Sequence, residues 1–169
     1  MDVAATTVAL EQFAQNSPLL ALLDAPGRER LALHGRVQDV AAGTCIVRQG
    51  EAGDTFYLIA TGEVRVRTAE AEGREVARLG AGMFFGEMAV IAGQPRSATV
   101  EAVGASRLIA FRRGPVLRIL RDYPRLHAIL GNTGLVRTET NLQQQLSDDA
   151  DDASLADGFD PASDPYGRR

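Results

Sequence analysis

The 169-residue sequence has one cysteine, two histidines and no lysine, so all 18 of its basic residues are arginine. The single cysteine, Cys45, allows no internal disulfide, which fits a reducing compartment. Because Cys45 lies in an apolar run, we expect a small core residue rather than a reactive thiol. No apolar run approaches the ~20 residues of a membrane span, and the N-terminus lacks both a basic start and a signal-type apolar core. These absences predict a cytoplasmic protein without a membrane partner.

The chain also lacks an excess of basic charge. The net charge is −4, and residues 147–169 hold seven Asp and two Arg, which leaves the remaining residues at +1. A nearly neutral body gives no electrostatic reason to expect nucleic-acid binding. Residues 147–169 contain too few apolar side chains to bury, so we expect a disordered acidic tail there.

Apolar residues follow helical spacing at both ends of the chain and alternate with polar residues in between. Residues 1–34 predict an N-terminal helical segment, with helices over 6–15, from Ser17-Pro18, and over 24–34. Residues 35–112 predict about eight short strands punctuated by glycines, and residues 55–60 and 63–68 predict a hairpin. The expected fold is α+β, an eight-stranded antiparallel jelly-roll β-barrel.

Residues 113–146 predict two C-terminal helices, separated by a break at Asp122-Tyr123-Pro124. The second helix contains Gly131 and Gly134, each costing about 1 kcal/mol relative to alanine. We therefore expect a weak point or hinge in this helix.

The most informative stretch surrounds a glycine at the expected start of a short helix. Gly86 lets backbone N–H groups approach an anion closely, and Arg96 offers a planar fork of donors that fits two phosphate oxygens. Glu87 would repel a phosphate, but it can accept a hydrogen bond from a neighbouring hydroxyl, for which a ribose 2′-OH is the obvious candidate. The alternative is that Glu87 and Arg96 form an ordinary surface ion pair, worth about 0–1 kcal/mol.

The stretch FGEMAVIAGQPRSATVEA, residues 85–102, resembles the phosphate-binding cassette of the cyclic nucleotide-binding domain family. The resemblance extends over roughly residues 10–145 and suggests a stand-alone bacterial member. It implies that Gly86 and the following amides hold the cyclic phosphate, that Glu87 binds the ribose hydroxyl, and that Arg96 binds the phosphate. The ligand-binding residues implied by the cassette are Phe85, Gly86, Glu87, Met88, Ala89, Arg96, Ser97 and Ala98.

The identity of the nucleotide base, and the residues that contact it, are harder to assign. In the family, a hydroxyl at the position of Ser97 is associated with tolerance of guanine, so both cAMP and cGMP remain candidate ligands. In related proteins the last helix moves over the base, which makes Arg137, Thr140 and Asn141 candidate base contacts. Val64, on an expected barrel strand, is the fourth candidate. Arg65 and Arg67 alternate on the face of that strand that we interpret as solvated.

The leading functional hypothesis is a sensor that binds cAMP or cGMP and acts through its C-terminal helices. It would act on an unidentified effector protein or through self-association, as a monomer or a helix-mediated homodimer. One alternative is a ligand-independent protein-interaction scaffold. Another is a transcription regulator without its DNA-binding domain, since residues past 146 are too few and too acidic for a helix-turn-helix.

The two histidines weigh against a metal-dependent barrel enzyme. His34 and His127 both lie in expected helices, outside the strands on which clustered metal ligands would have to stand. No Ser/His/Asp arrangement can be argued either. We therefore expect no catalytic residues, no metal and no cofactor.

Overall fold

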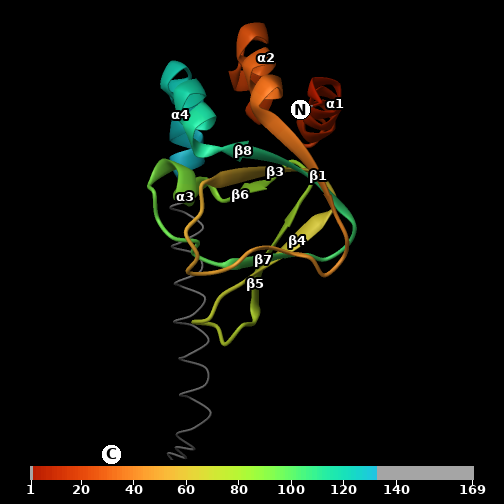
Figure 1. Ribbon diagram of the computed structural model, residues 1–169, viewed down its shortest axis with the longest axis vertical. Coiled ribbons are helices and arrows are strands. Elements are labelled where there is room, and N and C mark those ends of the chain that lie inside the picture. Colours follow the sequence, from red (N-terminus) through yellow and green to blue (C-terminus); the bar gives the residue numbers. More distant parts are fainter. Residues whose placement is uncertain (1, 133–169) are drawn as a thin grey trace, which may run out of the picture.

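The computed structural model describes residues 2–132, in which helices cover one side of two stacked β-sheets (Figure 1). The helices are α1 (Val3–Ala14), a 3₁₀ helix (Leu19–Leu22), α2 (Ala25–His34), α3 (Glu87–Ile91) and α4 (Arg113–Asp122), and residues 124–132 are also helical. The strands are β1 (Gly35–Val40), β2 (Cys45–Val47), β3 (Thr55–Thr61), β4 (Glu63–Arg67), β5 (Glu75–Gly80), β6 (Phe84–Phe85), β7 (Thr99–Ala102) and β8 (Ser106–Arg112). The expected combination of helices with antiparallel sheets is confirmed.

The strands form two four-stranded sheets with the orders β1-β8-β3-β6 and β2-β7-β4-β5. Every pair is antiparallel, and strands from the two ends of the chain alternate within each sheet, as in a jelly roll. Except for β4 and β5, consecutive strands therefore lie in different sheets. In particular β3 pairs with β6 and β8, whereas β4 pairs with β5 and β7.

The hairpin expected from residues 55–60 and 63–68 is therefore wrong. Gly62, with φ of 96°, lies against Ser106, whose hydroxyl accepts a hydrogen bond from Glu63 N at 3.2 Å. The turn directs the chain from one sheet to the other because each strand finds its partner far along the chain. The hairpin in this region is formed by β4 and β5, and its turn includes two positive φ angles, at Glu72 and Gly73.

Caps decide where the N-terminal helices begin. Asp2 Oδ1 accepts a hydrogen bond from Ala5 N at 3.1 Å, so α1 begins at Val3, ahead of the expected start. The helix expected after Ser17-Pro18 is a 3₁₀ helix rather than an α-helix. Asp24 caps α2 as expected, through Gly27 N at 2.9 Å.

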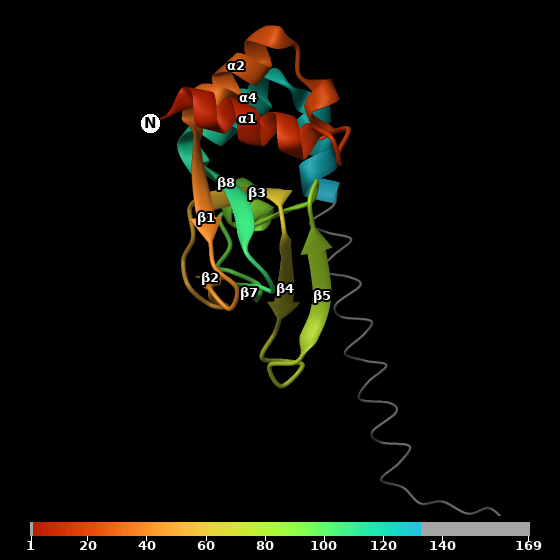
Figure 2. The same ribbon diagram turned by 90° about the vertical axis from the view of Figure 1, so that its right-hand side faces the viewer.

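Two apolar clusters hold the layers together. One fills the space between the helices and the β1-β8-β3-β6 sheet and includes Phe13, Phe111 and Ile119. The other lies between the two sheets and includes Ile59 and Leu108. Figure 2 shows the resulting arrangement, with α1, α2 and α4 on one side of the sheets.

The expectation that Cys45 is a core residue is wrong. Cys45 is half-buried and belongs to neither apolar cluster, because it stands opposite Glu101 on β7. Its Sγ donates weakly to Val47 O at 3.6 Å.

The break between α4 and the following helical residues lies at Tyr123, as the sequence indicates. The Tyr123 hydroxyl donates a hydrogen bond to Asp24, and Arg30 pairs with Asp122 at 2.7 Å. These contacts tie α2 to the end of α4. Among residues 2–132, no helix has both the length and the apolar character needed to cross a membrane.

Candidate ligand-binding site

One pocket opens between the cassette and the inner faces of β4, β5 and β7. All eight residues expected from the cassette line it, namely Phe85, Gly86, Glu87, Met88, Ala89, Arg96, Ser97 and Ala98. The remaining lining is almost wholly apolar and comes from Val47, Val66, Ala77, Leu79, Pro95 and Val100. The pocket therefore has a polar end at the start of α3 and an apolar wall on the sheet.

The polar end begins with the backbone of Gly86. Gly86 is the N-cap of α3 and has φ of 84°, the left-handed region that glycine tolerates. A Cβ at this position would lie 2.7 Å from Arg96 Nη1 and 2.9 Å from Thr55 O, too close for any other residue. The first amides of a helix have no intrahelical acceptor, so glycine here brings those donors beside the guanidinium.

Arg96 supplies the positive charge of the site. Its side chain is 8% exposed, and Nη2 donates to Thr55 O at 2.9 Å. The other terminal nitrogen, Nη1, is buried and has no hydrogen-bond partner in residues 2–132. A buried cationic donor without an acceptor is costly, so an anion at the polar end of the pocket would satisfy it.

Burial lowers the pKa of Arg96, because the low-dielectric surroundings disfavour the charged form. Tyr57, Asp54 and Glu87 oppose this shift by favouring the positive charge. Burial also raises the pKa of Tyr57, whose ring stacks on Phe85 with centroids 4.9 Å apart. The effect of burial on the pKa of Arg96 therefore outweighs that of these neighbours.

Glu87 occupies the first turn of α3 and is 5% exposed. Because both Glu87 and Arg96 are buried, the alternative of an ordinary surface ion pair is wrong. A buried carboxylate has to be hydrogen-bonded, so it can accept from a ligand hydroxyl while Arg96 offsets its charge.

Of the base contacts expected from the sequence, only Val64 lies within the described residues. Val64 is fully buried on the inner face of β4 but does not line the pocket. Val66, two residues further along the same face, does line it. Arg137, Thr140 and Asn141 lie outside the described residues. Ser97 is exposed at the pocket.

Sequence reasoning missed the loop that holds Arg96 in place. Gly50 N donates to Arg96 O at 2.8 Å, and Arg96 N donates to Glu51 O at 2.9 Å. Gly53 packs so closely on the guanidinium that a Cβ there would collide with Nε. The sequence shows glycines at positions 50 and 53, but only the structure shows that both contact Arg96, more than forty positions further along the chain.

The comparisons with known proteins agree with this geometry. The family model of the cyclic nucleotide-binding domain matches residues 37–123, just over half of the 169-residue chain. The chain therefore belongs to the cyclic nucleotide-binding domain family.

Among curated proteins, the regulatory subunit of cAMP-dependent protein kinase from Yarrowia lipolytica is 38% identical over 117 residues. The match covers 65% of this chain and 31% of that protein, so the chain spans about a third of the relative's length.

Two solved structures also show the fold. The catabolite activator protein of Thermus thermophilus is 32% identical with a TM-score of 0.63, covering 78% of this chain and 62% of that one. A regulatory subunit of a cAMP-independent protein kinase A from Trypanosoma brucei is 26% identical with a TM-score of 0.60, covering 71% and 46%.

Within residues 2–132, no three His, Cys, Asp or Glu side chains gather as metal ligands. The family is a regulatory, ligand-binding one rather than a catalytic one.

Proposed function

We propose that this domain binds a 3′,5′-cyclic nucleotide, cAMP or cGMP, in the pocket that Gly86, Glu87 and Arg96 share. Arg96 and the first amides of α3 hold the cyclic phosphate, and Glu87 accepts a hydrogen bond from the ribose 2′-OH. The observation that carries the proposal is the buried Arg96 Nη1, which lacks a partner and is 2.7 Å from a Cβ built on Gly86.

Charge balance favours a singly charged phosphate. Within residues 2–132, Arg96 is the one arginine that lines the pocket, and the Glu87 carboxylate lies close enough to favour its positive charge. A dianionic phosphate would add a second negative charge beside Glu87 without a second cation to offset it. A cyclic phosphodiester carries one charge and also brings a neighbouring hydroxyl that can donate a hydrogen bond to Glu87.

The apolar wall suits the base of the nucleotide. Val47, Val66, Leu79 and Val100 bring no hydrogen-bonding side chain to this part of the pocket. Ligand pockets commonly combine such an apolar lining with a few placed polar groups. We infer that the barrel holds the base by shape and apolar contact, and that Ser97 is its polar contact within the described residues.

The effect of ligand binding is transmitted through the C-terminal helices to an effector protein or to a second copy of the chain. Met88 supports this route, because it lines the ligand pocket and also a second hollow with Ile91, Pro124, His127 and Gly131. A ligand that shifts α3 therefore acts directly on residues 124–132.

A ligand-independent scaffold is the second candidate function. The observation that favours it is the similarity to a regulatory subunit whose kinase is described as cAMP-independent. Calorimetric titration with cAMP and cGMP separates the two candidates. Saturable binding of either nucleotide supports the sensor, and no heat with either at millimolar concentrations supports the scaffold.

Arg96→Ala tests the site itself. Hydrogen bonds to charged groups are worth about 1.5–3 kcal/mol, so we expect the Kd for the cyclic nucleotide to rise roughly 10- to 100-fold. Arg118→Ala is the matched control, because Arg118 is an exposed arginine of α4 that does not line the pocket. Unchanged affinity in a folded Arg96→Ala variant would remove Arg96 from the site.

A 2′-deoxy nucleotide tests the role of Glu87. The analogue should bind the wild type weakly, and it should lose little further affinity on Glu87→Gln because the hydroxyl contact is already absent. A large additional loss in the variant would contradict the assignment.

A further inference from the structure

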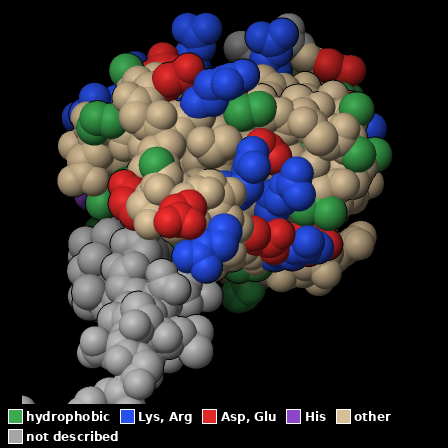
Figure 3. All heavy atoms as spheres, turned by 90° about the horizontal axis from the view of Figure 1, so that it is seen from below, with side chains coloured by type: hydrophobic (Ala, Val, Ile, Leu, Met, Phe, Trp, Pro, Cys, Tyr) green, Lys and Arg blue, Asp and Glu red, His purple; other side chains and the backbone are tan. Residues whose placement is uncertain are grey.

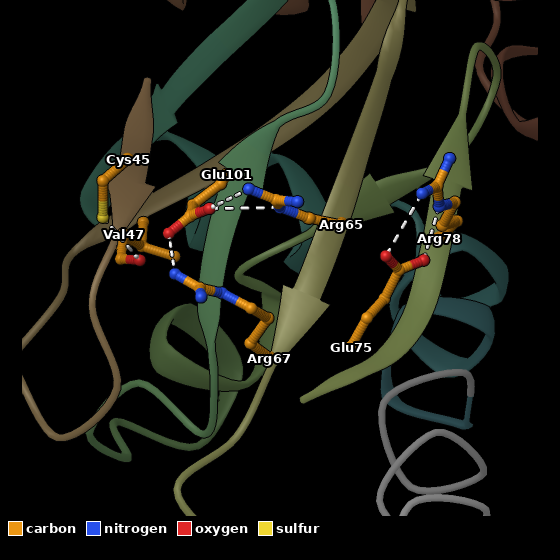
Figure 4. Close-up of polar contacts among 7 residues, drawn as sticks. All are labelled: Cys45, Val47, Arg65, Arg67, Glu75, Arg78 and Glu101. Atoms are coloured by element: carbon orange, nitrogen blue, oxygen red, sulfur yellow. Dashed lines mark hydrogen bonds and ion pairs between the residues drawn. The ribbon is translucent and has the colours of Figure 1, made fainter. Parts of the chain in front are cut away.

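The arginines on the outer face of the β2-β7-β4-β5 sheet are paired with carboxylates. Arg65 and Arg67 both bind Glu101, and Arg78 binds Glu75 (Figure 4). Seen from below, basic and acidic side chains lie next to one another (Figure 3). This face is therefore largely neutralised and offers little to an anion.

A groove of about 870 Å³ on the β1-β8-β3-β6 sheet differs in charge from this neutralised face. It lies where α1 and β1 begin and where β8 leads into α4, which are close together in Figure 2. Its polar lining comes mainly from His34, Arg36, Gln38, Thr55, Tyr57 and Arg112. No residue lines both this groove and the cyclic nucleotide pocket.

The strand register brings the two arginines of the groove together. Arg36 stands opposite Ala110, and Arg112 lies two residues further along β8 on the same face. Diagonal neighbours of this kind have Cα atoms about 7–8 Å apart. Two long side chains from such positions can therefore reach one ligand group between them.

These two arginines also lack negative partners. Arg36 and Arg112 are exposed, and neither side chain makes an ion pair or hydrogen bond with another group in residues 2–132. The one carboxylate that lines the groove is Asp2, whose Oδ1 accepts a hydrogen bond as the cap of α1. The Thr55 hydroxyl is engaged by Asp54 at 2.9 Å. Among the described residues that line the groove, the donors without a hydrogen-bond acceptor are therefore the two guanidiniums, His34, the Gln38 amide and the Tyr57 hydroxyl.

We propose that this groove is a second anion site, which takes the phosphate monoester group of a small molecule. Two guanidinium forks can each donate two hydrogen bonds to a tetrahedral dianion, and even with the Asp2 carboxylate the groove has one more net positive charge than the pocket of Arg96 and Glu87. This preference is the reverse of the cyclic nucleotide pocket, where a single arginine next to a glutamate suits a monoanion.

The proposal can be tested by titrating the full chain, at constant ionic strength, with inorganic phosphate and with ribose 5-phosphate. Amide NMR shifts follow binding, and saturating cAMP is present so that the cassette is not the site observed. We expect saturable shifts in β1 and at the end of β8, with dimethyl phosphate, a monoanion, binding more weakly. Tighter binding of ribose 5-phosphate identifies an organic monoester as the ligand, and equal binding identifies free phosphate.

Variants decide whether the groove is responsible. The double variant Arg36→Ala/Arg112→Ala should raise the phosphate Kd about tenfold or more, because two charge-assisted contacts are lost. Arg118→Ala removes the same kind of charge outside the groove and should change the Kd less than about twofold. Both arginines of the groove are exposed, so the variants should fold, and Arg36→Lys should keep part of the affinity.

Three results would overturn the proposal. These are no saturable binding, equal losses in the double variant and in Arg118→Ala, or a loss confined to Arg96→Ala. The last result would place the phosphate in the cassette. Because cAMP binding is measured separately, failure of the groove leaves the proposed sensor function standing, and failure of cAMP binding leaves the phosphate titration interpretable.

Discussion

Replacing Gly86 by alanine tests the geometry of the cassette more directly than removal of a charge. Gly86 has φ of 84°, so alanine there must adopt the left-handed conformation that costs about 1–2 kcal/mol. In addition, the new Cβ would lie 2.7 Å from Arg96 Nη1 and 2.9 Å from Thr55 O. Relief of such a clash typically costs a further 1–3 kcal/mol, roughly. The expected loss of stability is therefore about 2–5 kcal/mol.

Gly43 and Gly104 serve as controls that separate the cost of the left-handed backbone from the cost of the clash. Gly43 has the same φ of 84°, but a Cβ there has nothing within 4 Å, so Gly43→Ala carries only the backbone cost of about 1–2 kcal/mol. Gly104 has open space and no positive φ, so Gly104→Ala should be neutral or stabilise by up to about 1 kcal/mol.

Urea denaturation of the three variants gives the order of stability, and calorimetry with cAMP gives the affinity. Gly86→Ala should be the least stable and should also bind more weakly, because its Cβ displaces the arginine nitrogen that faces the pocket. Gly43→Ala should lose stability without losing affinity. If Gly86→Ala matched Gly43→Ala in both measurements, the close approach between Gly86 and Arg96 would not exist in solution.

Two further predictions concern the edge of the site and the end of α4. Ser97→Ala should reduce cGMP affinity more than cAMP affinity, measured by calorimetry, and equal losses would mean that the base is recognised elsewhere. The hydrogen bond from Tyr123 lowers the pKa of Asp24, so it stabilises the fold above the ordinary aspartate pKa of about 4 and is lost as the pH falls through the lowered value. Tyr123→Phe should therefore be less stable than wild type at about pH 7 in urea denaturation, with a deficit that narrows toward about pH 2; a constant deficit would contradict this coupling.

Local signals in the sequence predicted several elements well. Asp24 predicted the start of α2, because a cap depends on residues only three positions apart. The run from Phe85 to Ala98 predicted a short helix that begins after a glycine, and the structure brings its eight named residues to one pocket. Their roles in binding remain the proposal that the titrations test.

Local signals of this kind did not predict which strands pair with one another. The two runs joined at Gly62 have the alternation and turn of a hairpin, but β3 and β4 belong to different sheets. Their partners β8 and β7 lie roughly fifty and roughly thirty-five residues further along the chain, where the sequence gives no mark of which strand will be the neighbour. Val64 was a candidate base contact because the alternation of apolar and polar residues predicts which face of a strand a residue occupies. It does not predict how deep in the barrel the residue lies.

By itself the sequence determined which groups are available: a glycine at a helix start, an acid beside it, and an arginine after the next turn. Only the tertiary structure decided that Arg96 is buried, that Thr55 O takes one of its donors, and that Nη1 has no hydrogen-bond partner in residues 2–132. It also decided that Arg36 and Arg112 share a groove. The physical reason is that burial and pairing depend on strands that are distant along the chain, whereas the chemical character of a side chain does not.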